Sequence, residues 1–91
     1  MVEIRLASFL AERIGGINSV EVLADTVGLA LHALTERYPE LMRLIWAGGD
    51  GVVNPITAVF LNNDLLGPRQ LETSVKPGDQ IEILAMVSGG V

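Results

Sequence analysis

The feature that most constrains the fold is one strong amphipathic helix pattern that stands between two groups of strand-like segments. Its apolar side chains repeat every three or four residues, at Val27, Leu31, Leu34 and Tyr38. Asp25-Thr26 offers an N-cap at the start of this pattern, and Pro39 ends it because proline cannot continue a helix. A helix with one apolar stripe has to bury that stripe against another layer, and the neighbouring segments predict a sheet.

Two alternating segments precede this helix. Residues 2–6 and 20–23 alternate apolar and charged side chains, which is typical of half-buried strands. Residues 8–14 change to a helical rhythm, with Ser8 as the expected N-cap and Gly15-Gly16 as the end. We therefore expect an antiparallel hairpin with a long, partly helical connection.

Further strands follow the helix. Residues 39–46 predict a short second helix, and the nearly continuous apolar run 56–61 predicts a strand that is buried on both faces or lies near the sheet centre. Leu65-Leu66 suits a short edge strand. Lys76-Pro-Gly-Asp79 has proline and glycine at the central positions of a type II turn. Residues 80–87 then alternate as a final strand.

This order of elements predicts an α+β domain of two layers, with a mixed sheet of four or five strands packed on one main helix. The 91 residues suffice for one domain, with an expected radius of gyration of about 12 Å. We expect the folded body to span residues 1–87 and a flexible tail to span 88–91.

Charge and composition exclude several classes of function. Six basic against eleven acidic residues give a net charge of -5, which repels phosphate backbones, so we expect no nucleic-acid ligand. An acidic surface suits a protein partner with a positive patch, although the charge would equally serve solubility alone. The absence of cysteine excludes disulfides, cysteine-ligated zinc and a thiol nucleophile.

Location is predicted from what the sequence lacks. No apolar run reaches the roughly 18 residues of a membrane span, and no basic region followed by an apolar one suggests a signal peptide. We expect a soluble, cytoplasmic protein without a membrane partner.

No group of residues in the sequence predicts an enzyme active site. His32 is expected to face solvent, with Glu36 as its nearest possible partner, and Trp46 is expected to anchor the core or an interface. Gly48-Gly-Asp-Gly51 lacks the Lys-Ser/Thr of a phosphate loop. Aspartates fall in caps and turns, where they bond the backbone: Asp25, Asp50, Asp64 and Asp79. We expect no bound metal or cofactor.

The carboxyl-terminal segment carries the strongest functional signal. Gly89 and Gly90 form poor strand and bury nothing, but they let another protein approach the main chain closely. Residues 87–90 reach roughly 13 Å when extended, enough to enter a neighbour's active site. Leu84 and Met86 point away from Ile83 and Ala85, so with Val87 they would form an apolar docking patch unless a helix or loop covers them.

Residues 75–90 resemble the carboxyl terminus of the MoaD/ThiS sulfur carrier proteins, which are ubiquitin-like domains of the β-grasp fold. The shared pattern is a Pro-Gly-Asp turn, an apolar strand and a final Gly-Gly. The hairpin, the helix and the segment Phe60-Leu-Asn-Asn-Asp64 extend the resemblance over essentially the whole chain.

The resemblance implies a carrier that is the substrate of an enzyme. An E1-like adenylyltransferase would use ATP to adenylate the carboxylate of Gly90, and a persulfide or sulfide donor would convert it to a thiocarboxylate. An acceptor synthase would then use the sulfur to make molybdopterin, a thiazole, cysteine or another thiolated product. Ser88 and Gly89 would supply a slim, extended passage for the tail.

One residue departs from the family pattern. Carriers ready for use end at the second glycine, whereas this sequence continues with Val91. A peptidase that removes Val91 would restore the pattern. The residue would otherwise be an extension from cloning or gene annotation, or mark a ubiquitin-like binding module that has lost carrier chemistry. Conjugation of Gly90 to lysines of other proteins, as a protein modifier, is a further possibility.

Overall fold

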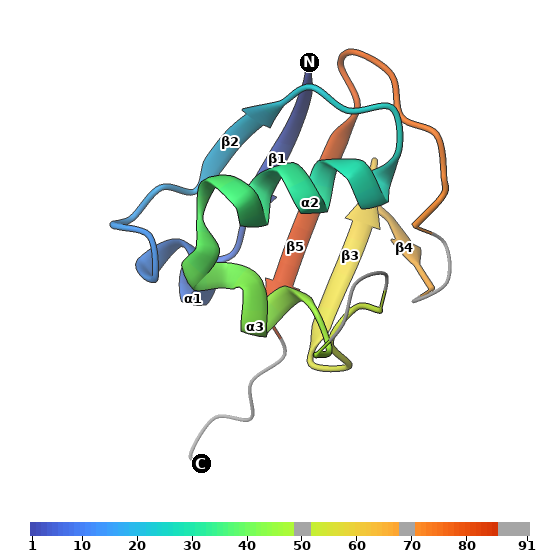
Figure 1. Ribbon diagram of the computed structural model, residues 1–91. Coiled ribbons are helices and arrows are strands. Elements are labelled where there is room, and N and C mark those ends of the chain that lie inside the picture. Colours follow the sequence, from blue (N-terminus) through green and yellow to red (C-terminus); the bar gives the residue numbers. More distant parts are fainter. Residues whose placement is uncertain (49–51, 68–70, 86–91) are drawn as a thin grey trace.

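The computed structural model describes residues 1–48, 52–67 and 71–85, which form a five-stranded sheet with the main helix on one side (Figure 1). This is the predicted α+β arrangement of two layers. In chain order the elements are β1 (Val2–Leu6), α1 (Ser8–Glu12), β2 (Ser19–Val22), α2 (Val27–Arg37), the 3₁₀ helix η1 (Pro39–Leu41), α3 (Met42–Ile45), β3 (Thr57–Leu61), β4 (Asp64–Leu66) and β5 (Gln80–Ala85).

The sheet is mixed, with the strand order β2-β1-β5-β3-β4. β1 and β5 run parallel, with Ile4 beside Ile81, while the other neighbouring pairs are antiparallel. The predicted hairpin of the first two strands and the short edge strand β4 are both confirmed. The last strand of the chain lies at the centre of the sheet, and its parallel pairing makes β1 and β5 start at the same end.

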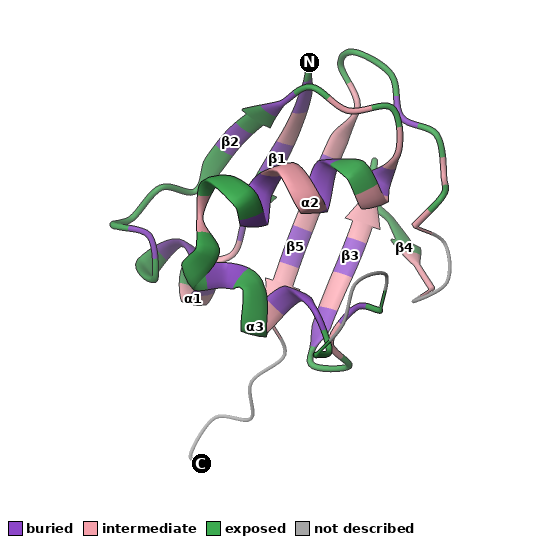
Figure 2. Ribbon diagram, viewed as in Figure 1, coloured by how far each residue is buried: buried purple, intermediate pink, exposed green. Residues whose placement is uncertain are grey.

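The core lies between α2 and the sheet. The Thr26 hydroxyl accepts a hydrogen bond from the Leu29 amide (3.1 Å) and caps α2, as predicted. The buried positions of α2 lie over the buried positions of the central strands, both purple in Figure 2. The largest fully buried side chains of these elements are Val27, Leu31 and Leu34 from α2 and Val2, Ile4, Ile81 and Ile83 from the strands.

Trp46 is the buried anchor that the sequence predicts, and its contacts correct one expectation. Its Nε1 donates to the hydroxyl of Thr35 (3.2 Å), which in turn donates to the Leu31 carbonyl (3.1 Å). His32 stacks on the Trp46 ring with centroids 4.5 Å apart and is half-buried. The prediction that His32 faces solvent is wrong, because α3 brings Trp46 against this side of α2.

Two boundary predictions near the amino terminus are also wrong. Ala7 occupies the N-cap position of α1 in extended geometry, without a side-chain cap, and Ser8 is the first helical residue. Leu23 lies beyond β2 and is 82% exposed. The helix thus begins one residue earlier than the capping pattern predicts, and the strand ends one residue earlier than the alternating pattern predicts.

The apolar run before residue 62 is buried on one face only. β3 begins at Thr57, one residue later than expected, and Ile56 is exposed. Thr57 and Val59 are buried against the helical layer, but the residues between them are half-buried. β3 also lies beside the edge strand β4, whereas β5 is central. Burial on both faces was therefore the wrong alternative, whereas the other one, a strand near the sheet centre, is confirmed because β3 pairs with the central strand β5.

The turn before β5 forms as predicted. The Asp79 amide donates to the Lys76 carbonyl (3.0 Å), and Gly78 has the positive φ (93°) that a type II turn requires. The Asp79 carboxylate accepts from the Lys76 amide (2.9 Å), which confirms its backbone-bonding role. No helix in the described part of the chain is long and apolar enough to cross a membrane.

Candidate functional site

The carboxyl end of β5 is fixed on both sides. Ala85 lies opposite Thr57 of β3, and the Ala7 amide, just before α1, donates to the Ile83 carbonyl (3.1 Å). Thr57 in turn donates its hydroxyl to the Leu44 carbonyl. The residues that follow Ala85 therefore start from a well-anchored point at the end of the central strand.

Most of the predicted site lies beyond this point. The structure places Leu84, but the other predicted site residues lie outside the described residues: Met86, Val87, Ser88, Gly89, Gly90 and Val91. The boundary expected between a body at 1–87 and a tail at 88–91 falls in the same segment. The roles assigned to these residues, and that boundary, remain predictions.

Leu84 lies on the side of the sheet that faces away from α2, here called the open face. It sits opposite Ala58 in β3, and the next outward residue of β3, Phe60, sits opposite both Glu82 and Leu65. Leu84, Ala58 and Phe60 are half-buried, and Leu65 is 64% exposed. These four residues form the apolar half of the open face and lie on β5 and the strands at one side of it.

The other half of the open face is polar. Glu3 of β1 accepts hydrogen bonds from the Ser19 hydroxyl (2.8 Å), the side-chain Nε2 of Gln80 (3.0 Å) and Arg5 Nε (3.4 Å). The bond from Gln80, followed by that from Ser19, lowers the pKa of the Glu3 carboxyl. Arg5 also lies beside Glu82 across the parallel β1–β5 pair. The open face thus combines apolar side chains with carboxylates.

Asparagine side chains and the Asp79 turn fix the opposite end of β5. Asn62 and Asn63 both have positive φ (49° and 74°), as the tight β3–β4 turn requires. The side-chain Oδ1 of Asn62 accepts a hydrogen bond from the backbone amide of Gln80 (2.9 Å). The Nδ2 of Asn62 donates to the Asp79 carboxylate (3.1 Å). Bonds from the Lys76 amide and Asn62 lower the pKa of Asp79. The motif Phe60-Leu-Asn-Asn-Asp64 therefore serves to hold β5 in place.

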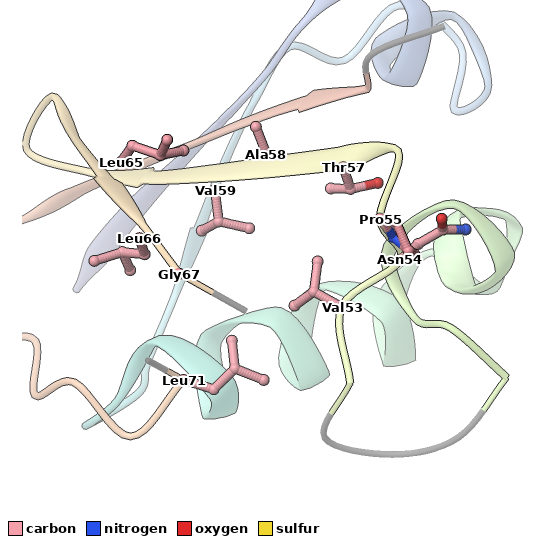
Figure 3. Close-up of a pocket in the computed structure, with 10 residues that line it drawn as sticks. All are labelled: Val53, Asn54, Pro55, Thr57, Ala58, Val59, Leu65, Leu66, Gly67 and Leu71. Carbon is pink, nitrogen blue, oxygen red and sulfur yellow. The ribbon is translucent and has the colours of Figure 1, made fainter. Parts of the chain in front are cut away.

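A pocket of about 160 Å³ lies between β3, β4 and the segments that flank them (Figure 3). Its apolar lining comprises Val53, Pro55, Ala58, Val59, Leu65, Leu66 and Leu71. Its two polar side chains are already committed: Asn54 bonds the Arg43 carbonyl and the Ile56 amide, and Thr57 bonds the Leu44 carbonyl. No polar side chain of this lining remains to orient a substrate, so the pocket makes a poor catalytic site.

Metal-binding and acid–base groups give no competing site in the described ranges. No cluster of three or more His, Asp or Glu side chains in residues 1–48, 52–67 and 71–85 could hold a metal ion. The imidazole ring of His32 stacks on the indole ring of Trp46, and the Thr35 hydroxyl bonds the backbone carbonyl of His32 rather than its ring. The end of β5 and the open face beside it therefore remain as the candidate site.

The sequence profile of the ThiS family matches residues 5–90, nearly the whole chain and up to the second glycine. The chain belongs to the ThiS family. This confirms the resemblance to the MoaD/ThiS carriers and, with the sheet order above, the ubiquitin-like β-grasp fold. No sequence among the curated proteins matches the chain.

Solved structures similar to this ThiS-family chain include single proteins and complexes. A chain of the Amycolatopsis orientalis BexX/CysO complex is 28% identical, with a TM-score of 0.79, over 99% of this chain and 100% of that one. Small archaeal modifier protein 1 from Methanosarcina acetivorans is 29% identical, with a TM-score of 0.85, over 98% and 95%. A chain of the complex of subunits 1 and 2 of the Helicobacter pylori molybdopterin-converting factor is 26% identical, with a TM-score of 0.63, over 98% and 97%.

Sequence reasoning missed the companions of Leu84 on the open face. Phe60 and Ala58 were assigned to a strand buried on both faces or near the sheet centre, and Leu65 to an edge strand without a functional role. The alternation of side chains along a strand is enough to place Phe60 and Val59 on different faces of the sheet. The pairing that puts Phe60 beside Glu82 of β5 depends on the register of the two strands, which the alternation does not give.

Proposed function

We propose that this protein is a sulfur carrier whose Gly90 is activated as an acyl adenylate and converted to a thiocarboxylate. The observation that carries the proposal is the ThiS-family match, which runs through β5 and the diglycine to Gly90. The anchored end of β5 supports it, because a fixed base lets a partner enzyme locate a short segment by docking on the folded body. The protein would act as a substrate of its partners rather than as a catalyst.

The chemistry requires a free carboxylate on Gly90, so Val91 has to be removed first, by a peptidase on this proposal. A carboxylate oxygen of Gly90 then attacks the α-phosphate of ATP, and pyrophosphate leaves. Sulfide attacks the carbonyl carbon of the adenylate, AMP leaves with its bonding electrons, and loss of a proton gives the thiocarboxylate. If a persulfide delivers the sulfur, a thiol has to reduce the resulting acyl disulfide. Glycine offers no side chain that would obstruct either attack.

The open face is the surface that we assign to partner docking. Leu84 with Ala58, Phe60 and Leu65 offers apolar area, and the carboxylates of Glu3 and Glu82 suit a partner with basic side chains. Two of the similar structures are complexes with a second protein, which supports an acceptor synthase as one partner. The proposed partners are thus an E1-like adenylyltransferase, a sulfur donor and an acceptor synthase.

The acceptor remains open among four products: molybdopterin, cysteine, a thiazole and another thiolated metabolite. The neighbours named for CysO and for molybdopterin-converting factor favour the first two routes or a related thiolation.

The direct test uses a chain that ends at Gly90. It is incubated with the E1-like enzyme of the same organism, ATP and sulfide, and its intact mass is measured. The expected product carries sulfur in place of one oxygen. A matched variant that ends at Gly89 should load poorly, because its carboxylate is one residue short of the adenylation centre. The proposal would be contradicted if only the unmodified carboxylate were recovered while the same enzyme preparation released pyrophosphate with another carrier protein.

A second candidate is a ubiquitin-like protein modifier, which the likeness to the Methanosarcina acetivorans modifier favours. It shares the adenylation step but transfers Gly90 to lysines of other proteins. Adducts of higher mass in cells, lost when Gly90 is deleted, would support this role. A non-catalytic interaction module would keep partner binding and biological activity when residues 89–91 are deleted, and this outcome would count against both roles.

A further inference from the structure

Primary amines are scarce in this chain. Lys76 is the only lysine in the sequence, and the other five basic residues are arginines. A guanidinium stays protonated at neutral pH and is a poor nucleophile, whereas a lysine amine attacks activated acyl groups once it loses its proton. If the activated Gly90 acylates a side-chain amine of this protein, that amine can only be the one of Lys76.

Lys76 lies at the end of the sheet where β5 starts. It opens the turn that is closed by the Asp79–Lys76 backbone bond (3.0 Å), and the Gly78 amide in this turn donates to the Met1 carbonyl (3.1 Å). The Lys76 side chain is exposed, and the ion pair in the described part of the chain, between Arg5 and Glu3, does not involve it. An anchored backbone thus presents a solvent-accessible amine.

β5 starts with Gln80 at this end of the sheet and finishes with Ala85 at the opposite end (Figure 1). From Gln80 to Ala85 the strand spans about 17 Å. Gly90 is five residues beyond Ala85, so even at full extension it reaches at most about 18 Å. If the chain folded back along β5, Gly90 would reach only as far as Gln80, and the turn that carries Lys76 lies beyond Gln80. Contact with Lys76 of the same chain would require both segments to be stretched, at a large entropic cost.

We propose that Lys76 is the acceptor of the activated Gly90 of a second copy of this chain, and that the fold withholds it from its own Gly90. The inference rests on the activation of Gly90 proposed above. The neutral amine of Lys76 attacks the carbonyl carbon of Gly90, and a C–N bond forms. The bond to the leaving group, AMP or a thiolate, breaks with its electron pair, and the nitrogen loses a proton to solvent. Because donor and acceptor lie at opposite ends, the link is head-to-tail and extends to open chains.

The test activates Gly90 without any partner enzyme. Residues 1–90 are produced as an intein fusion and released with an aryl thiol, which leaves a thioester on Gly90. The thioester is incubated in mildly alkaline buffer, folded or in urea, and intact masses are followed. The folded protein should yield dimers lighter than two chains by one water, with the isopeptide bond mapped to Lys76. A cyclised monomer, lighter by one water, should form only in urea.

Two variants control this experiment. Lys76→Arg keeps the charge and should reduce dimers about tenfold or more, since the nucleophile is gone. Lys76→Arg/Ser8→Lys moves the amine beside the end of β5, because Ala7 is bonded to Ile83 there. This variant should form the cyclised monomer while folded.

Three results would overturn the inference: a folded wild-type protein that cyclises as fast as the one in urea, dimers unaffected by Lys76→Arg or linked through the α-amine, and hydrolysis without dimers. None of them bears on the enzymatic loading of Gly90 with sulfur, which is measured separately. A chain that dimerises through its thioester but is never adenylated would instead contradict the proposed function.

Discussion

Leu84 of β5 lies directly opposite Ala58 of β3 on the face of the sheet that turns away from α2. The small alanine leaves the leucine half-exposed next to the point where the chain leaves the sheet. An apolar side chain in this position serves little purpose in the core. We therefore regard this pair as the centre of the docking surface.

Replacing Leu84 by glutamate should weaken partner binding with little effect on the fold. We expect the affinity for the E1-like enzyme to fall about tenfold or more, as for a central interface residue. The free energy of unfolding should change by less than about 1 kcal/mol, because the side chain is half-exposed. Titration calorimetry and urea unfolding measure the two quantities. Leu29→Glu, the same change at a leucine 54% exposed on α2, is the matched control and should leave binding intact.

Stability should decline in acid through Glu3 and Asp79. Hydrogen bonds lower the pKa of both carboxyls in the folded state, so the unfolded chain binds more protons as the pH falls. Their contribution is fully present above the unfolded pKa values and is lost below about pH 4.5 as each folded pKa is passed. Melting temperatures measured from pH 7 to strongly acidic buffer should show this fall. The double variant Glu3→Gln/Asp79→Asn should have a lower melting temperature at pH 7 and should lose less of it in acid. If its melting temperature fell with pH as steeply as that of the wild type, the assignment to Glu3 and Asp79 would be contradicted.

Thr35→Val should destabilise the fold by about 1–3 kcal/mol, because it leaves the buried Trp46 Nε1–H without an acceptor. Urea unfolding measures the change. In a Trp46→Phe background, where no indole N–H exists, the same substitution should cost less. Equal costs in the two backgrounds would mean that the hydrogen bond between Thr35 and Trp46 contributes nothing.

Gly28→Ala should destabilise the protein by roughly 1 kcal/mol, although alanine is favoured over glycine within helices by a similar amount. A Cβ on Gly28 would lie 3.1 Å from the Leu71 carbonyl oxygen. That oxygen accepts the Gly28 amide (2.8 Å), so it cannot withdraw without losing the bond. Thermal unfolding measures the effect. If the variant were more stable instead, the backbone at Leu71 would have to shift away from the new Cβ at little cost in free energy.

Local patterns gave correct predictions for α2 and for the turn before β5, where neighbours in sequence decide the conformation. The apolar stripe of α2, its cap at Thr26 and its end before Pro39 depend on helix geometry and backbone bonds within a few residues. The same holds for the turn at Gly78, whose positive φ glycine adopts without strain. The motif around the Pro-Gly-Asp turn and the diglycine was sufficient to predict the family.

Predictions failed where distant segments decide the environment of a residue. His32 is half-buried because α3 carries Trp46 to it, and nothing within one helical turn of His32 indicates that contact. Phe60 and Ala58 belong to the open face because helices cover the other side of β3. The burial of a strand depends on what packs against each face, so an apolar run alone does not reveal it.

The amino-acid sequence by itself determined most of the elements and the β-grasp class, since these depend on periodicity and on the properties of single residues. It also contains the diglycine Gly89-Gly90 on which the proposed acyl chemistry rests. Only the tertiary structure decided that β5 lies at the centre of the sheet beside β1. It also set Leu84 on the open face and Lys76 at the opposite end of β5 from the tail. The physical reason is pairing over long separations, as between Gln80 and Glu3, 77 positions apart, whose hydrogen bond exists only once the strands lie side by side.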